Sequence, residues 1–117
     1  MSSQFAVVLD SLVRQRGVTG SLVVSEADGI IVDSILQVGI KGPVVAALAA
    51  SLYRKARLSS STAGLGEATF CTFEAQRGRI CAAGRGDLVL VVVAVSAANF
   101  GLIRVEMLKA VEAGALA

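Results

Sequence analysis

The segment from Leu88 to Val95 limits the fold of this chain more than any other feature. It reads Leu-Val-Leu-Val-Val-Val-Ala-Val and contains no polar or charged side chain. A strand with one face in solvent alternates apolar and polar residues, whereas a strand covered on both faces does not. We therefore expect this segment to be the central strand of a sheet that carries helices on both faces.

Turn and helix-end signals divide the rest of the chain. Asp28-Gly29 lies between two apolar runs, which is the strongest short-range signal of a β-hairpin. Pro43 suits the first turn of a helix, because that position needs no amide donor. Apolar residues at helical spacing precede Gly17 and Gly114, which can end helices. These signals predict a helix over 3–16, strands over 20–25 and 30–32, a helix over 43–58, a flexible loop over 59–66, strands over 67–74, 79–83 and 88–95, and a helix over 100–111.

The order of these elements, α-β-β-α-β-β-β-α, predicts an α+β fold with three layers. One five-stranded antiparallel sheet would carry helices on both faces. The last three strands form a meander, which places strand 67–74 at an edge of the sheet with Phe70 and Phe73 on opposite faces. A length of 117 residues corresponds to one domain, residues 1–117.

Apolar residues are too abundant for a domain of this size to bury them all. Hydrophobic residues make up 55% of the chain, which also contains 12 glycines. A domain near this size buries only about two thirds of the surface that its unfolded chain exposes. Composition therefore favours association with a partner. In the helix over 43–58, the small side chains fit either an interface or simply a helix of high propensity: Ala46, Ala47, Ala49 and Ala50.

Composition also excludes several classes of function. The formal net charge of +2 is too small to favour nucleic acid as a partner. The chain has no His, the commonest general base, and no Gly-x-x-x-x-Gly-Lys phosphate loop. The glycine pairs around Leu65 and Arg85 fit ordinary turns. We therefore expect no catalytic residue, no cofactor and no metal.

The location of the protein follows from two further features. The start of the chain has no basic leader before its apolar residues, so no secretory signal is visible. The charge-free run that begins at Leu88 is shorter than the about 20 residues that span a bilayer. We expect a cytoplasmic protein that does not insert into a membrane.

The two cysteines lie on neighbouring predicted strands. A hairpin centred near Gln76 would place Cys71 and Cys81 opposite each other. Two thiols without His make a poor zinc site, and two cysteines cannot form a multi-disulfide framework. We expect both to be buried free thiols.

Four residues near the end of the second predicted helix each allow two interpretations. Arg54, Lys55 and Arg57 could contact an acidic partner or a nucleotide phosphate, or could be solvated cations that complement the negative end of the helix dipole. Tyr53, the only tyrosine, suits an interface or the core equally well.

Taken in order, these segments resemble the Roadblock family of dynein light chains and bacterial MglB-like regulators. No single motif is diagnostic, and the resemblance rests on the order and spacing of segments over nearly the whole chain. The matching segments are the helix from Phe5 to Leu12, the hairpin from Leu22 to Val32, the helix from Ala46 to Tyr53, the strand ending at Glu74, the run from Leu88 to Val95, and Gly101 to Arg104.

The resemblance implies a homodimer. Strands 67–74 of two subunits would meet edge to edge and the helices over 43–58 would pack across the twofold axis. On this basis the dimer interface would contain Ala47, Ser51, Arg54, Thr69, Phe70, Cys71, Thr72 and Phe73. A further partner would contact Tyr53, Arg54, Lys55 and Arg57.

The resemblance also implies a function. Family members bind small Ras-like GTPases and either stimulate GTP hydrolysis or act as scaffolds. We therefore expect a non-catalytic homodimeric adaptor that binds a small GTPase. Two alternatives stay open: a small-molecule-sensing module, since three-layer domains of this shape also hold ligands between sheet and helix, and a structural tether of a larger complex.

Overall fold

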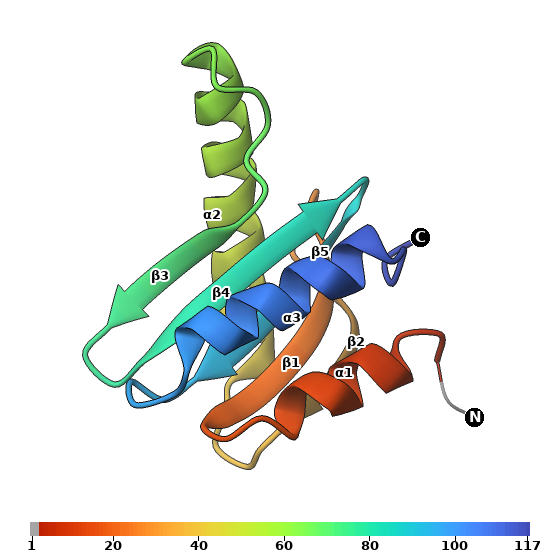
Figure 1. Cartoon of the computed structure of the whole chain (residues 1–117), viewed down its shortest axis with the longest axis vertical. Coiled ribbons are helices and arrows are strands. Elements are labelled where there is room, and N and C mark those ends of the chain that lie inside the picture. The colour runs from red at the N-terminus through yellow and green to blue at the C-terminus, as the bar shows by residue number, and fades with distance from the viewer. Residues whose placement is uncertain (1–2) are drawn as a thin grey trace.

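The computed structural model describes residues 3–117 and confirms the expected order of elements (Figure 1). The single five-stranded antiparallel sheet has the strand order β2-β1-β5-β4-β3. The elements are α1 (Ala6–Val13), β1 (Val18–Ser25), β2 (Ile31–Leu36), α2 (Gly42–Thr62), β3 (Cys71–Ala75), β4 (Gly78–Arg85), β5 (Leu88–Ala94) and α3 (Phe100–Glu112).

Strand β5 occupies the centre of the sheet, as its unbroken apolar sequence predicts. Its residues from Val89 to Val92 are completely buried. Strand β3 forms one edge of the sheet, as expected, and β2 forms the other. The hairpin between β1 and β2 turns at Asp28-Gly29, where Gly29 adopts a φ of 72°.

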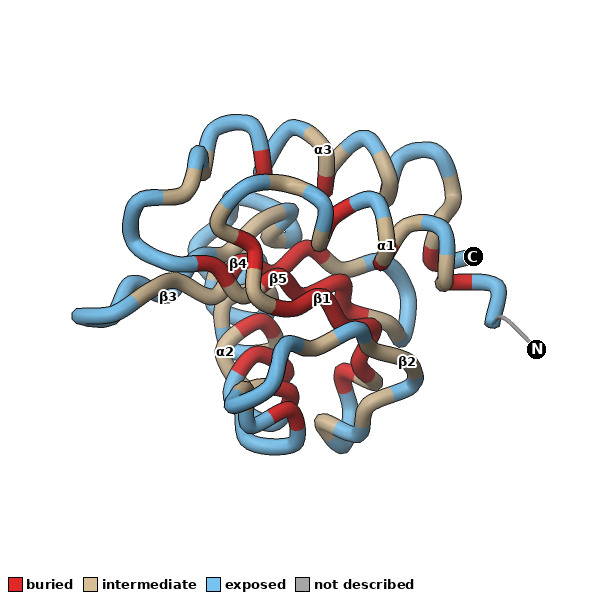
Figure 2. The backbone as a smooth tube through the Cα atoms, turned by 90° about the horizontal axis from the view of Figure 1, so that it is seen from below, coloured by how far each residue is buried: buried red, intermediate tan, exposed pale blue. Residues whose placement is uncertain are grey.

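Helices cover both faces of the sheet and create two separate cores (Figure 2). The first core cluster lies beneath α1 and α3, and its members include Leu9, Leu12, Leu90, Ile103 and Met107. The second core cluster lies beneath α2, and its members include Leu22, Ala46, Ala49, Ala50, Tyr53 and Val91. Three of the four alanines singled out in α2 therefore pack toward the sheet, whereas Ala47 is exposed.

Helix α2 is longer than the sequence predicts. It continues through four residues of the expected loop and ends at Thr62, and its distal end projects beyond the sheet (Figure 1). The hydroxyl groups of Ser60 and Thr62 donate to the carbonyls of Arg57 and Leu58 within the helix. These side chains therefore do not break the helix, and the chain turns only at Gly64, with a φ of 80°.

Strand β3 begins later than predicted, and its register differs by one residue. The strand starts at Cys71, so Thr69 and Phe70 precede it. Its hairpin with β4 closes on Ala75 and Gly78, which pairs Cys71 with Ala82 and not with Cys81. A shift of one residue moves a side chain to the other face of a sheet. The expectation that the two cysteines lie opposite each other is therefore wrong.

The two thiols lie on opposite faces of the sheet. Cys81 belongs to the first core cluster, whereas Cys71 packs against the second. Burial raises the pKa of both thiols above the ordinary value of 9.0. Both groups therefore remain protonated at neutral pH, which makes them poor nucleophiles.

We predict that both cysteines are reduced and dispensable. Cys81→Ala should lower the free energy of unfolding by about 1 to 2 kcal/mol, and Cys71→Ala by less because its side chain is only half-buried. Mass spectrometry of the unreduced protein and denaturant titrations measure these quantities. A quantitative disulfide, or a melting temperature that collapses on adding reductant, would contradict this prediction.

Candidate functional site

Strand β3 leaves one side of its backbone unpaired. The turn closes on Ala75 and Gly78, so Cys71, Phe73 and Ala75 bond to β4 and the intervening residues Thr72 and Glu74 direct their N–H and C=O groups outward. The register of β3 with β4 is continuous, whereas β2, at the opposite edge, is interrupted by a bulge. Bulges protect sheet edges from pairing, so β3 is the edge better suited to extend the sheet.

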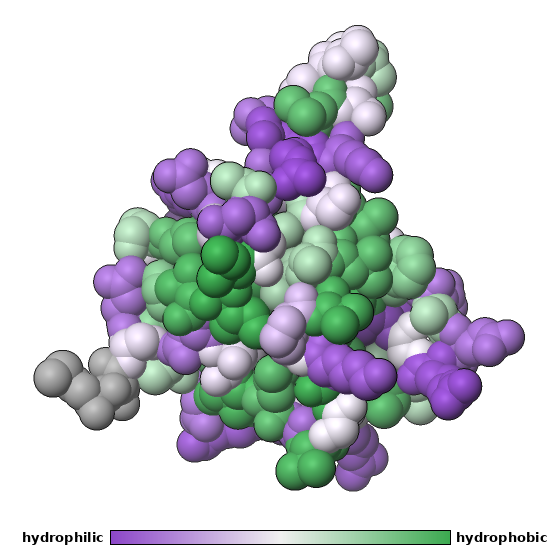
Figure 3. Space-filling model, turned by 180° about the vertical axis from the view of Figure 1, so that it is seen from behind, coloured by the Kyte–Doolittle hydropathy of each residue, from purple (hydrophilic) through white to green (hydrophobic). Residues whose placement is uncertain are grey.

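An apolar surface lies between β3 and the near side of α2. Phe73 is 41% exposed and Leu48 is 37% exposed, although both are large apolar side chains. Both side chains line a hollow of about 390 Å³, together with Ile40, Ile80 and Val93. Leu52 of α2 and Cys71 of β3 both line a second hollow, of about 170 Å³. Figure 3 shows that hydrophobic residues cover the middle of this face of the molecule.

The residues near β3 that the sequence suggested for the dimer interface differ in their exposure. Thr72 and Phe73 lie exposed on β3, and Cys71 is half-buried beside α2. Thr69 is exposed just before the strand, whereas Phe70 packs against the first core cluster, with the Arg104 guanidinium 5.4 Å from its ring centre.

The suggested residues of α2 do not adjoin β3 within this chain. Ala47 lies next to Gly29, and Arg54 donates to backbone carbonyls of the same β1–β2 turn. Ser51 is half-buried. From α2, Leu48 lines the first hollow, and Ala49, Leu52 and Tyr53 line the second. The apolar spacing of four residues between Leu48 and Leu52 could have indicated this.

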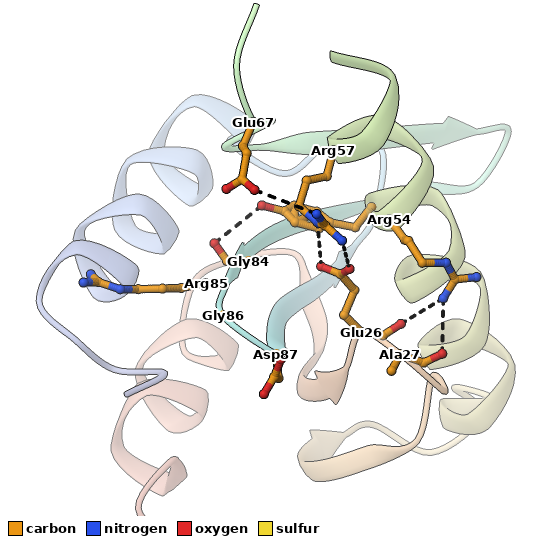
Figure 4. Close-up of a pocket in the computed structure, with 10 residues that line it drawn as sticks. Glu26, Ala27, Arg54, Arg57, Glu67, Gly84, Arg85, Gly86 and Asp87 are labelled. Carbon is orange, nitrogen blue, oxygen red and sulfur yellow. Dashed lines mark hydrogen bonds and ion pairs between the residues drawn. The ribbon is translucent and has the colours of Figure 1, made fainter. Parts of the chain in front are cut away.

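A polar hollow of about 520 Å³ lies on the other side of α2 (Figure 4). Arg57 donates two hydrogen bonds to the Glu26 carboxylate, from Nε at 3.2 Å and from Nη2 at 2.6 Å. Its Nη1 lies 3.8 Å from the Glu67 carboxylate. The hydrogen bonds to Glu26 and the charge of Glu26 raise the pKa of Arg57. Arg85 and Asp87, which also line the hollow, point away from this pair.

The three cations of α2 are not at the end of the helix. The helix continues beyond Arg57 to Thr62 and its last turn contains no basic residue, so the interpretation as cations that complement the dipole is wrong. Arg54 and Arg57 both have partners within the chain, and Lys55 is exposed.

Tyr53 occupies the core, one of the two roles that the sequence left open. Its side chain is 2% exposed. The hydroxyl donates to the Ala68 carbonyl at 2.9 Å and lies 3.5 Å from the Gly84 carbonyl. Burial raises the pKa of the phenol above 10.0, so the hydroxyl keeps the proton that it donates.

Within residues 3–117, no three His, Cys, Asp or Glu side chains lie close enough together to hold a metal ion. No helix in that range has the length and apolar character to cross a bilayer. The features described above are an unpaired strand edge, apolar hollows and an ion-pair cluster. They are suited to contacts between proteins.

Comparison with known proteins identifies the family. The sequence profile of the Roadblock/LC7 domain matches residues 5–94. The chain belongs to the Roadblock/LC7 domain family. An uncharacterized protein of Methanocaldococcus jannaschii is 33% identical to it over 105 residues, which cover 90% of this chain and 88% of that protein.

Solved Roadblock/LC7 structures share the fold. A Roadblock/LC7 domain from Streptomyces avermitilis superimposes with a TM-score of 0.80 at 20% identity, covering 95% of this chain and 97% of that one. Myxococcus xanthus MglB gives a TM-score of 0.80 at 21% identity, covering 94% and 90%. An MglB with a tetrameric arrangement gives 0.83 at 17% identity, covering 99% and 90%.

Proposed function

We propose that this Roadblock/LC7 domain is a non-catalytic homodimeric adaptor of the cytoplasm that binds a small Ras-like GTPase. The observation that carries the proposal is the unpaired, unbulged edge of β3 beside the apolar surface formed by the exposed Leu48 and Phe73 and the half-buried Leu52. An edge of this kind is a template for pairing with another strand. A second copy of the chain would extend the sheet and cover the apolar side chains.

One observation on a relative and one property implied by the family resemblance support this proposal. A solved MglB relative has a tetrameric arrangement, so self-association occurs among chains of this fold. Roadblock proteins, which this sequence resembles, bind Ras-like GTPases. The dimer would present one continuous ten-stranded sheet and both α2 helices to such a partner.

The contacts of the two α2 arginines bear on how a GTPase would be stimulated. An arginine supplied in trans to the active site of a GTPase is worth about a thousandfold or more in rate. In this chain Arg54 and Arg57 bond to Glu26 and Ala27, and would have to break those contacts first. Stimulation would therefore act by positioning groups that the GTPase already contains.

We predict that Arg54→Ala leaves any stimulation of hydrolysis within about threefold, because a catalytic arginine would cost far more. The test combines the purified chain with Ras-like GTPases of the same genome, loaded with GTP or GDP, and measures pull-down and phosphate release.

Several outcomes of this test would contradict the proposal. One is nucleotide hydrolysis by the chain alone, above that of a boiled sample. Another is a failure to bind every such GTPase combined with saturable binding of a metabolite, which would favour a sensing module. A loss of stimulation near a thousandfold in Arg54→Ala would show that the arginine acts directly.

A further inference from the structure

The segment from Glu67 to Phe70 carries the chain from α2 to the edge strand β3 and is held by two side chains of α2 and by contact with the first core cluster. Tyr53 of α2 donates its hydroxyl hydrogen to the Ala68 carbonyl at 2.9 Å. Arg57, one helical turn further along, lies 3.8 Å from the Glu67 carboxylate. Phe70 packs against the first core cluster beneath α3. The start of β3 is therefore fixed by side-chain contacts.

Arg57 and Tyr53 cannot easily leave these positions. Glu26 is only 8% exposed, and its carboxylate would be left unpaired in a poorly solvated site if Arg57 moved away. The Tyr53 ring is buried in the second core cluster beside Gly84. Both residues are thus held by the body of the domain while they bond to the segment that precedes β3.

We propose that Tyr53 and Arg57 are positioning residues for self-association, forming a clamp that fixes the start of β3 against α2. This inference rests on the proposed dimer through β3. Sheet extension requires the outward groups of Thr72 and Glu74 to be aligned, and a start of β3 that is free to move would add an ordering cost to pairing. The clamp removes this cost and so raises the affinity of the dimer, although neither residue need contact the second copy.

The clamp also couples two surfaces. Arg57 lines the polar hollow, whereas the outward groups of β3 belong to the dimer edge. A partner that drew Arg57 away from Glu67 would weaken pairing at β3, and dimerisation would weaken the binding of that partner by the same factor.

The test uses two variants that each weaken the hold on the segment before β3 and leave the rest of the clamp in place; the Tyr53 hydroxyl also lies 3.5 Å from the Gly84 carbonyl, a contact that Tyr53→Phe removes as well. Tyr53→Phe keeps the ring and removes only the hydroxyl, and Glu67→Gln keeps the Arg57–Glu26 pair intact. Tyr53→Phe should raise the dissociation constant of the dimer about fivefold, the equivalent of one net hydrogen bond. Glu67→Gln should raise it about two- to fourfold, because the exposed carboxylate forms a weaker pair.

Hydrogen exchange distinguishes positioning from a general loss of stability. The amides of Cys71 and Phe73, which bond to β4, should exchange faster in both variants, while those of β1 and β5 should not change. Two matched controls should alter neither readout. Thr62→Val removes a hydroxyl hydrogen bond at the far end of α2, and Arg14→Gln removes an exposed ion pair with Asp10.

Each result decides between the alternatives. Unchanged exchange in β3 and an unchanged dissociation constant in both variants would overturn the clamp. Equal acceleration throughout the sheet would also overturn it, since that would indicate a purely structural role. If the wild-type chain is a monomer, the proposed dimer fails, but faster exchange confined to Cys71 and Phe73 would still support the clamp.

Discussion

Replacing Thr72 with proline should convert the protein from a dimer into a monomer. Proline has no N–H to donate, and the amide of Thr72 points away from β4 toward the open edge. The pairs that hold β3 to β4 use Cys71, Phe73 and Ala75, so the fold of the single chain should survive. Light scattering should report twice the chain mass of 11.9 kDa for the wild type and 11.9 kDa for the variant.

The matched control is Thr72→Val, which keeps the amide and suits a strand. It should remain a dimer. Circular dichroism and a thermal melt would establish that Thr72→Pro is folded. A wild-type mass of one chain at micromolar concentration would refute the dimer. A Thr72→Pro dimer would place self-association at a surface other than the β3 edge.

The central part of the fold could be predicted from the sequence because its signals are local and strong. The unbroken apolar run of β5 has one explanation in a small domain, burial on both faces. Asp28-Gly29 between apolar runs specifies a hairpin turn. Neither signal depends on contacts between residues far apart in the chain, so the element order and the positions of the central and edge strands follow from them.

The ends of elements and the environment of individual side chains could not be predicted. Serine and threonine favour loops and helices almost equally when their hydroxyls can bond within a helix. The run of these residues therefore did not end α2, which continues to Thr62, and the chain turns at Gly64. The register of β3 depends on which residue begins a turn, and an error of one residue predicted that the two cysteines share a face of the sheet, whereas they lie on opposite faces. Arg54 and Arg57 found partners in a turn that lies 27 to 31 residues away in sequence, which no local pattern reveals.

Gly84→Ala should destabilise the protein by about 1 to 3 kcal/mol, the usual cost of overpacking a core. A Cβ atom at this position would lie 2.5 Å from Cε1 and 2.8 Å from Cζ of Tyr53. The Tyr53 ring is rigid and buried, so it cannot yield as the end of a flexible side chain would. Displacing the ring would also weaken its hydrogen bond to the Ala68 carbonyl. Denaturant titration measures the change in the free energy of unfolding.

Gly101→Ala is the matched control, because a Cβ there meets only the Asn99 side chain, at 3.5 Å. That variant should be neutral or more stable by up to about 1 kcal/mol, since alanine favours a helix over glycine. The decisive comparison places Gly84→Ala in a Tyr53→Leu background. If the clash with the ring causes the loss, the second substitution costs much less there, because the two residues are coupled. An equal cost in both backgrounds would show that the backbone at Gly84, and not contact with Tyr53, requires the glycine.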